Sequence, residues 1–275
     1  MSFVVIDKCW LQGFINTDKL QKLTSSHRVL IPDILMYEIS TTEDEGVKFN
    51  CFKKLDSIKE SIDFLPNSGF LIKSELSSQS SSPSIQEKLY PKTLYPIFLK
   101  NLFLLSNPKF KVSNFPNDLY YEQFEKKDVD YLKKIGSTIS YYFPELQGIK
   151  GGTKKELVKK IKNELGQDKK KLKDLLKKFI QDSIKFCDNQ VLPPVEKINE
   201  NWVLFRYFQV YSIAWVDFIG KYGEGNINVN SSKFPNRCID FEYCIAGLLS
   251  GAIATRDQLV EEIFEICCPE GVLYN

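Results

Sequence analysis

The feature that most constrains this chain is an apolar stretch between two acids, Asp240 and Asp257, in the sequence CIDFEYCIAGLLSGAIATRD. The pattern predicts a helix from Asp240 to about Ser250, a turn at Gly251 and a short strand over Ala252–Thr255. Such a reversal brings Asp257, at the carboxyl end of the strand, near Asp240. Open α/β sheets place their chemistry at the carboxyl ends of their strands. The stretch therefore predicts an α/β fold with two acids at one edge of a sheet.

Two further acids follow apolar runs near the N-terminus. Ser2–Ile6 is apolar on both faces, which is typical of a buried parallel strand, and Asp7 comes directly after it. Val29–Ile31 is a second short strand, and Glu38 lies about one turn into the helix expected after it. A short helix over residues 8–23 is expected between the two strands. Strands that alternate with helices predict a parallel sheet flanked by helices.

Composition places the chain among globular proteins. With 275 residues, 43% of them hydrophobic, it is long enough for one large domain or two modest ones. Its seven cysteines form no CxxC pair, so we expect reduced thiols rather than a zinc site. The start, MSFVVIDKCW, lacks the pattern of a signal peptide, and the run Cys244–Ala254 is too short to span a bilayer. We therefore expect a cytoplasmic protein with no membrane partner.

The chain has one histidine, His27, which restricts its chemistry. A Ser-His-Asp triad, a Cys-His pair or a histidine-based metal site would have to use this residue. It stands in SSHRV, a polar approach to a strand, where a plain surface histidine is the simpler account. A hydrolytic activity would therefore rest on carboxylates and a metal ion.

Residues 61–199 differ in character from the two ends of the chain. The Ser-rich segment 74–84, SELSSQSSSPS, predicts a surface loop or tether. Asp128–Tyr142 is expected to be helical. The Lys-rich segment 150–180 holds twelve lysines and four acids, and its apolar spacing predicts two amphipathic helices that break at Gly166. Its lysine face is either plain solvated surface or a contact for a phosphate backbone. Beyond it, Asn201–Lys221 is apolar nearly all round and predicts a buried helix.

Four motifs in chain order resemble those of PIN-like domains, the fold of many metal-dependent ribonucleases, including the toxins of many bacterial toxin–antitoxin pairs. They are VVID with Asp7, LIPDILMYEI with Glu38, IDFEYCIAGLL with Asp240, and AIATRD with Asp257. The last is the most characteristic, a small-apolar strand that ends in Thr-Arg-Asp about seventeen residues after an acid on a helix. The resemblance covers roughly residues 1–60 and 200–275 as a PIN-like core, with 61–199 as a mainly α-helical insertion.

The resemblance implies that these four acids hold one or two Mg²⁺ or Mn²⁺ ions and catalyse the hydrolysis of RNA phosphodiester bonds. Carboxylate oxygens suit these ions, and crowded carboxylates repel one another, which favours the entry of a cation. Many members have Thr or Ser and then Asn after the first Asp, whereas here Lys8 and Cys9 follow. Glu242 and Thr255 are expected to contact the metal-binding acids without binding the ion themselves.

Partners follow from the same resemblance. An RNA such as a tRNA or an mRNA is expected to contact the lysine face through Lys154, Lys155, Lys159 and Lys162. A role as a toxin or phage-defence effector, with a protein inhibitor or regulatory subunit, is what the family suggests. The alternative is a catalytically inactive PIN-like module that binds RNA or a protein. A flap-endonuclease type of DNA nuclease is less well supported, and the only DxD motif, Asp128 to Asp130, stands in a helical context that a TOPRIM site would not have.

Overall fold

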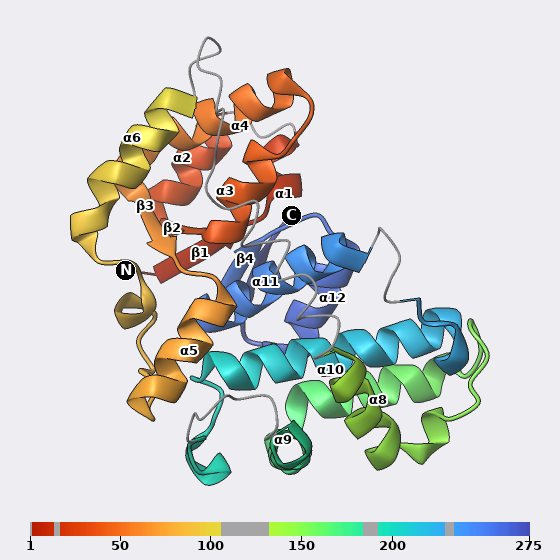
Figure 1. Cartoon of the computed structure of the whole chain (residues 1–275). Helices are drawn as coiled ribbons and strands as arrows, with labels where there is room; N and C mark the ends of the chain where they lie inside the picture. The colour runs from red at the N-terminus through yellow and green to blue at the C-terminus, as the bar shows by residue number, and fades with distance from the viewer. Residues whose placement is uncertain (1, 14–16, 106–131, 184–191, 229–233) are drawn as a thin grey trace.

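A five-stranded parallel sheet lies at the centre of the computed structural model, which describes residues 2–13, 17–105, 132–183, 192–228 and 234–275. The strand order is β3-β2-β1-β4-β5, and every neighbouring pair is parallel. The strands are β1 (Ser2–Ile6), β2 (His27–Pro32), β3 (Ile62–Leu65), β4 (Ala252–Ala254) and β5 (Val272–Tyr274). Helices flank this sheet (Figure 1). The predicted α/β class with a parallel sheet is confirmed.

The central strand β1 carries the register of the sheet. Val4 pairs with Val29 of β2 on one side, and Val5 pairs with Ile253 of β4 on the other. The side chains of Val4, Val5 and Ile6 are fully buried. A strand in the middle of a parallel sheet is covered on both faces, which is why its sequence is a continuous apolar run rather than an alternating one.

The first half of the sheet is connected by short helices. They are α1 (Lys8–Gln12), α2 (Thr17–Ser26), α3 (Asp33–Ser40) and α4 (Glu45–Asp56). The single helix predicted over residues 8–23 is therefore two helices, because α1 ends at Gly13. Trp10 and Leu11, both buried, hold the short α1 against the core.

The predicted extent of the core needs correction at β3. Ile62–Leu65 forms the edge strand next to β2, although residues from 61 on were assigned to the insertion. A hydrophobicity pattern does not predict this strand, because Asp63 interrupts its apolar residues. That carboxylate is buried, forms an ion pair with Arg28 of β2, and accepts a hydrogen bond from the Tyr95 hydroxyl at 2.9 Å. A charge paired across neighbouring strands is compatible with a buried position.

The Ser-rich segment 74–84 is not a tether throughout. Its first residues complete α5 (Ser68–Ser78), and a second short helical segment, Ile85–Lys88, follows the loop. Glu75 within the segment is 5% exposed. Low sequence complexity concealed this buried carboxylate, whose contacts with α10 are described in the Discussion.

Helices make up most of the remaining described residues. They are α6 (Tyr95–Leu105), α8 (Lys155–Gln167), α9 (Lys169–Ser183), α10 (Val203–Tyr222), α11 (Phe234–Ser250) and α12 (Gln258–Cys267). Residues 132–142 are helical as predicted, while the preceding part of that prediction, including Asp128 and Asp130, lies outside the described residues. The predicted break at Gly166 falls two residues later, at Asp168.

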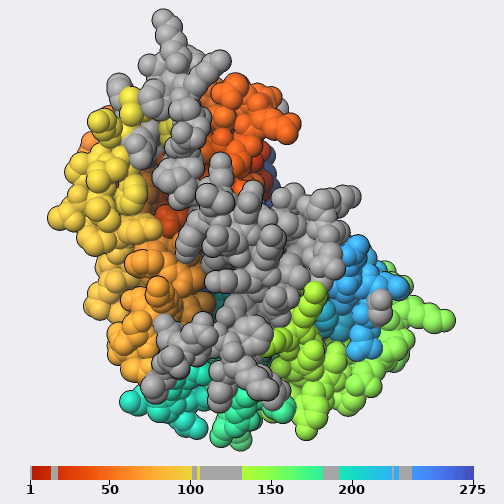
Figure 2. Space-filling model, in the orientation of Figure 1, coloured from red at the N-terminus to blue at the C-terminus, as the bar shows by residue number. Residues whose placement is uncertain are grey.

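The predicted buried helix is α10, which packs against α5, α8 and α11. In Figure 1, α8, α9 and α10 lie together below the sheet. The space-filling view of Figure 2 shows α4 to α6, in orange and yellow, on one side of this face and the helices from residue 132 onward, in lime to blue, on the other. Among the described helices, none combines the length and the apolar character needed to cross a membrane.

Candidate functional site

The strand order changes direction between β1 and β4. From β1 the chain adds β2 and β3 on one side, and it later returns to add β4 and β5 on the other side. A point of this kind leaves a crevice at the carboxyl ends of the two strands, which is where open α/β sheets bind their ligands. Asp7 directly follows β1, and Asp257 stands three residues after the end of β4. The two acids thus flank the switch point of the sheet.

Asp7 is held by contacts to both of its carboxylate oxygens. Oδ1 accepts a hydrogen bond from the backbone N–H of Cys9 at 3.1 Å, as the N-cap of α1. Oδ2 accepts from the Thr255 hydroxyl at 2.6 Å and from the Cys9 thiol at 3.0 Å. The Asp7 residue is 4% exposed. Its carboxylate is therefore fixed in place by Cys9 of α1 and by Thr255, the residue directly after β4.

Asp257 is the N-cap of α12. Its Oδ1 accepts hydrogen bonds from the backbone N–H groups of Leu259 and Val260 at 2.9 and 3.1 Å. Its Oδ2 lies 3.9 Å from Nη1 of Arg237. Thr255 connects the two strand-end acids, because its hydroxyl donates to Asp7 and accepts from the backbone N–H of Asp257 at 3.1 Å. Thr255 therefore supports the carboxylate of Asp7 and the backbone at Asp257.

Asp240 reaches the same place from α11. The helix begins six residues earlier than predicted, at Phe234, so Asp240 lies inside it and is not its N-terminal residue. Gly251, at a φ of +76°, makes the tight turn from α11 into β4, a backbone conformation that favours glycine. The helix and strand therefore return the chain as the sequence predicted, and they set Asp240 beside Asp257.

The pKa of Asp240 is raised to about 8. Burial of the carboxylate is the largest cause, and the negative charges of Asp257 and Asp7 add to it. The guanidinium of Arg237, with Nη1 at 3.2 Å from Oδ2 of Asp240, acts in the opposite direction. Three acids from three separate elements thus interact electrostatically, and an arginine lies between two of them.

Glu38 on α3 joins the group through Asp7. Its Oε1 lies 3.3 Å from Nζ of Lys8, and its Oε2 accepts a hydrogen bond from the Tyr243 hydroxyl at 2.9 Å. The pKa of Glu38 is raised, with burial as the largest cause. The charge of Asp7 also raises it, whereas the contacts with Lys8 and Tyr243 act in the opposite direction. Lys8 is one of the two residues that depart from the PIN-like pattern, and its ammonium group partly balances the charge of Glu38.

The donor set suits a hard cation in its chemistry, since all four predicted ligands are carboxylates. Their placement is less favourable. Within the described ranges, no three His, Cys, Asp or Glu side chains are arranged so that they could together hold a metal ion. The carboxylates contact Lys8, Arg237, Cys9 and Thr255 instead. The negative charge that would attract a divalent ion is therefore present, but it is partly balanced by the protein's own cations.

Glu242 lies elsewhere. It is 6% exposed, and its Oε2 accepts a hydrogen bond from the backbone N–H of Ser68 at 2.9 Å, while its Oε1 accepts from the Ser68 hydroxyl. Burial raises the pKa of Glu242. Glu242 stands two residues after Asp240 on α11, and side chains at this spacing point to different faces of a helix. Glu242 therefore caps α5 and does not support Asp240.

Three residues at the site were not assigned a role from the sequence. Arg237 stands three residues before Asp240 on one helix, a spacing that brings side chains together, so this contact had a visible signal. Tyr243 reaches Glu38 from the same helix. The Cys9 thiol donates to Asp7 and accepts from the backbone N–H of Arg256 at 3.2 Å, and burial together with the charge of Asp7 raises its pKa to about 12. The Cys9 thiol therefore takes part in the site as a hydrogen-bonding group beside Asp7.

The lone histidine lies away from the acids. His27 begins β2, at the opposite end of the strands from Asp7, and its two ring nitrogens lie 2.7 Å from the Ser2 and Tyr274 hydroxyls. An imidazole in this place cannot serve as a base for the acidic edge.

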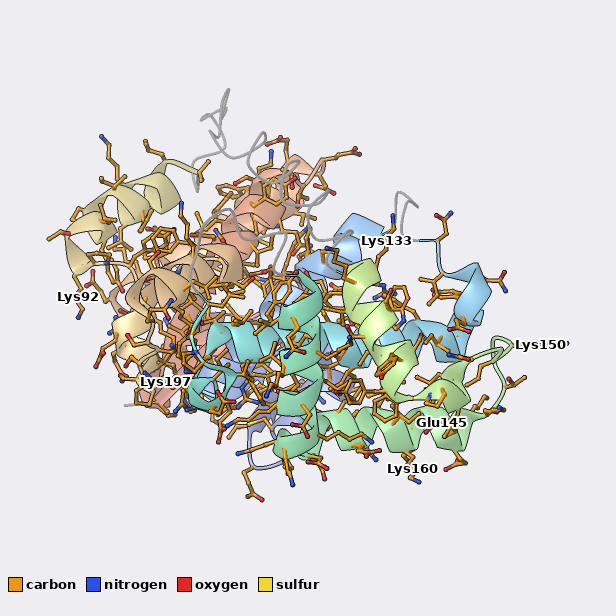
Figure 3. All side chains as sticks on the ribbon, turned by 60° about the horizontal axis from the view of Figure 1, so that its bottom comes forward. Lys92, Lys133, Glu145, Lys150, Lys160 and Lys197 are labelled. Carbon is orange, nitrogen blue, oxygen red and sulfur yellow. The ribbon has the colours of Figure 1, made fainter. Side chains whose placement is uncertain are left out.

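The predicted lysine face divides into exposed and buried members. Lys154, Lys155 and Lys159 are exposed. Lys162 is not part of that face, because it is 3% exposed and its Nζ lies 3.0 Å from Oδ1 of Asp217 and 2.5 Å from Oε1 of Glu262. A buried lysine stays charged only with such partners. Figure 3 shows Lys133, Lys150 and Lys160 at separate places around the helical part, so its positive charge is not gathered at a single point.

Comparison of the chain with protein-family models, with curated proteins and with solved structures finds no match. The resemblance to PIN-like domains therefore rests on the four motifs of the sequence. What the structure adds is that Asp240 interacts electrostatically with Asp257 and Asp7, and Glu38 with Asp7, at the switch point of a parallel sheet.

Proposed function

We propose that this protein is a metal-dependent endoribonuclease with a PIN-like core. The observation that supports the proposal is the placement of Asp240 beside Asp257 and Asp7 at the carboxyl edge of β1 and β4, where burial first, and then the charges of these two acids, raise its pKa. Mutually repelling carboxylates destabilise the folded protein unless a cation offsets their repulsion, and such clusters are typical of functional sites. Binding a hard divalent cation would offset the repulsion here, and hydrolysis of a phosphodiester bond is the reaction that the four motifs suggest.

In this proposal Asp7, Asp240 and Asp257 would hold Mg²⁺ or Mn²⁺. Glu38, which interacts electrostatically with Asp7, would add negative charge to the site. The ion would supply an activated water and neutralise charge on the phosphoryl group. Thr255 and Cys9 fix the orientation of Asp7 by their hydrogen bonds. Arg237 exchanges its carboxylate partners for a phosphate oxygen of the substrate, a contact for which a guanidinium is well suited.

The proposed substrate is RNA, which includes the tRNA and mRNA classes expected from the sequence. The exposed Lys154, Lys155 and Lys159 at the start of α8 offer contacts to its backbone. A role as a toxin or phage-defence effector, controlled by a protein inhibitor, extends the same proposal.

The test is cleavage of end-labelled RNAs, single-stranded oligomers and a tRNA among them, by protein stripped with EDTA and then supplied with Mn²⁺ or Mg²⁺. We expect cleavage that Asp7→Asn and Asp257→Asn each reduce at least about a hundredfold, because loss of one carboxylate weakens the hold on the ion. Glu270→Gln, an exposed acid in the loop before β5, is the matched control and should cut normally. Absence of metal-dependent cutting across the panel, or normal cutting by both Asp variants, would refute the proposal.

A second candidate is a catalytically inactive PIN-like module that binds RNA or a protein. The observation in its favour is that Lys8 and Arg237 already neutralise two of the acids. RNA binding in EDTA without any cleavage after Mn²⁺ or Mg²⁺ is added would select this candidate over the first.

A further inference from the structure

We infer that the surface formed by Tyr141, Tyr142 and one face of α9 binds single-stranded RNA, with an unpaired base stacked on the ring of Tyr141. This inference deepens the proposed function, on which it rests for the choice of RNA as the ligand. It assigns substrate contacts to a surface other than the predicted lysines at the start of α8.

Tyr141 is the most exposed of the large hydrophobic side chains in the described part of the chain, at 71% of its surface. It ends the helical stretch 132–142, which lies at the surface in Figure 2 (lime). A single exposed aromatic ring is common on protein surfaces, so the exposure of Tyr141 gains its meaning from the groups that lie beside it. A nucleic-acid base is a flat partner for such a ring, and stacking on aromatic side chains is the main way in which proteins hold unpaired bases.

A lysine of α9 accompanies this ring. Nζ of Lys178 lies 5.5 Å from the centroid of the Tyr141 ring, and Lys177 beside it is exposed. An ammonium group beside a stacking ring can contact a backbone phosphate of the strand whose base stacks there, because every base is carried on a charged sugar-phosphate backbone. The ring and the cation together therefore fit the two chemical parts of a nucleotide.

Three contacts that follow one another along α9 join this surface to that helix. Nζ of Lys171 lies 4.3 Å from the ring centroid of Phe143, the Tyr142 hydroxyl donates to the carbonyl of Asp174 at 3.3 Å, and Lys178 lies over Tyr141. Positions 171, 174 and 178 share one face of a helix. The ring of Tyr142 also meets that of Tyr141 at 73°, with centroids 5.5 Å apart. A platform fixed in this way loses little entropy when a base binds.

Acidic groups also lie at this edge. Asp174 and Glu145 are both exposed, so the surface is not a simple positive patch. Stacking on Tyr141 must then supply the selectivity for unpaired bases, and the lysines add a salt-dependent contribution. This balance is what distinguishes the surface from a general polyanion site.

The test measures the affinity of the full-length protein for a fluorescein-labelled 12-nucleotide oligouridine by fluorescence anisotropy, in EDTA so that no cleavage occurs. We expect Tyr141→Ala to weaken binding by about five- to a hundredfold, the range that stacking of one base provides. Tyr141→Phe should retain the affinity, because it keeps the ring. Lys178→Gln should lower the slope of log K against log salt by about 0.7, the value for one phosphate contact on a single strand.

Phe70→Ala is the matched control. Phe70 is an aromatic residue on α5 that is 52% exposed. It lies far from Tyr141, because α5 contacts the N-terminal end of α10, whereas Ser140, next to Tyr141, contacts Glu224 just beyond the C-terminal end of α10. We expect this variant to bind as the wild type does. The inference is overturned if wild-type protein does not bind the oligomer, if Tyr141→Ala binds normally, or if a duplex RNA of equal length binds as well as the single strand. RNA binding through Tyr141 without metal-dependent cleavage would leave this surface standing while the proposed nuclease activity falls.

Discussion

At the scale of single residues, the site is a set of carboxylates balanced by cations from the same chain. Lys8 contacts Glu38, and Arg237 lies 3.2 Å from Asp240 and 3.9 Å from Asp257. The acids themselves were predictable, because each follows a strand or stands in a helix that returns to the sheet. Their partners depend on side-chain orientation in three dimensions, and of these only Arg237 had a sequence signal, its spacing from Asp240.

The raised pKa of Asp240 makes stability depend on pH. The pKa is about 8 in the folded protein, against 3.8 for an ordinary aspartate, so folding takes up a proton between these values. The carboxylate is therefore increasingly unfavourable to the folded state as the pH rises from about 4 to about 8. We expect Asp240→Asn to stabilise the metal-free protein at pH 8, by on the order of a few kcal/mol, and to have much less effect at pH 5.

Urea unfolding of both proteins in EDTA at the two pH values measures this difference. The exposed Glu43→Gln provides the comparison and should change stability little at either pH. An Asp240→Asn effect of equal size at pH 5 and pH 8 would show that the buried charge is not its origin.

Arg237 should compete with a divalent ion, because both positive charges would contact the same carboxylates. We expect Arg237→Gln to tighten Mn²⁺ binding by about tenfold, which corresponds to roughly 1.4 kcal/mol. The readout is the rise in melting temperature over a Mn²⁺ titration, with the exposed Lys159→Gln as a charge-matched control. Weaker Mn²⁺ binding by Arg237→Gln would mean that the arginine supports the ion and does not compete with it.

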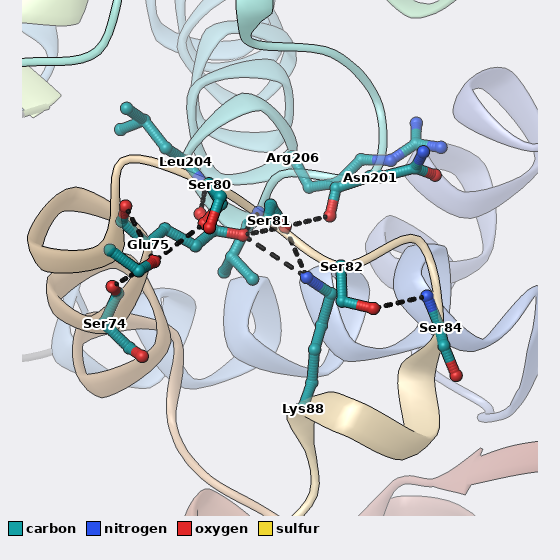
Figure 4. A network of polar contacts seen from close by, with 12 residues as sticks. Ser74, Glu75, Ser80, Ser81, Ser82, Ser84, Lys88, Asn201, Leu204 and Arg206 are labelled. Atoms are coloured by element: carbon teal, nitrogen blue, oxygen red, sulfur yellow. Dashed lines mark hydrogen bonds and ion pairs between the residues drawn. The ribbon is translucent and has the colours of Figure 1, made fainter.

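At the scale of elements, the Ser-rich segment shows how a buried contact can be hidden in a polar sequence. Oε1 of Glu75 accepts hydrogen bonds from the backbone N–H of Val203 at 2.8 Å and from the Ser81 hydroxyl at 2.5 Å, and its Oε2 accepts from the N–H of Leu204 at 3.2 Å (Figure 4). Nζ of Lys88 lies 3.4 Å from Oε1. The start of α10 has no side-chain cap of its own, and Glu75 takes that place. No local pattern in SELSSQSSSPS predicts a partner more than a hundred residues away.

Replacement of Glu75 by alanine should therefore destabilise the protein. It removes the acceptors of two buried backbone donors and leaves Lys88, whose pKa burial already lowers, without its carboxylate. We expect a loss of about 3 to 5 kcal/mol in the free energy of unfolding, the range for breaking a buried ion pair. Chemical denaturation measures it.

A double variant separates the two contributions. Glu75→Ala combined with Lys88→Met should recover part of the loss, because the unpaired buried charge is removed as well. The neighbouring Glu87→Ala, an exposed acid in the same segment, should have little effect. A destabilisation by Glu75→Ala below about 1 kcal/mol would contradict the capping role.

At the scale of the whole molecule, the sheet places the acids, and the helical part is fastened to it through buried polar contacts. Lys162 of α8 contacts Asp217 of α10 and Glu262 of α12. The parallel sheet, the switch-point acids and the buried α10 were predictable because they follow from apolar patterns and chain reversals. The edge strand β3 and the burial of Lys162 were not, because each depends on a charge pairing between distant segments. Such features cannot be predicted from a local sequence pattern, because a charged side chain is buried only where a partner from another segment offsets its charge.

We propose that the acids at the carboxyl edge of β1 and β4 form one site for a hard divalent cation. The most direct test is isothermal titration calorimetry of Mn²⁺ into EDTA-stripped protein at pH 7.5, with the wild type and Asp257→Asn compared. The account predicts saturable binding of one or two ions by the wild type and at least about a tenfold loss of affinity in the variant. Absence of saturable Mn²⁺ binding at millimolar concentration, or equal binding by both proteins, would contradict it.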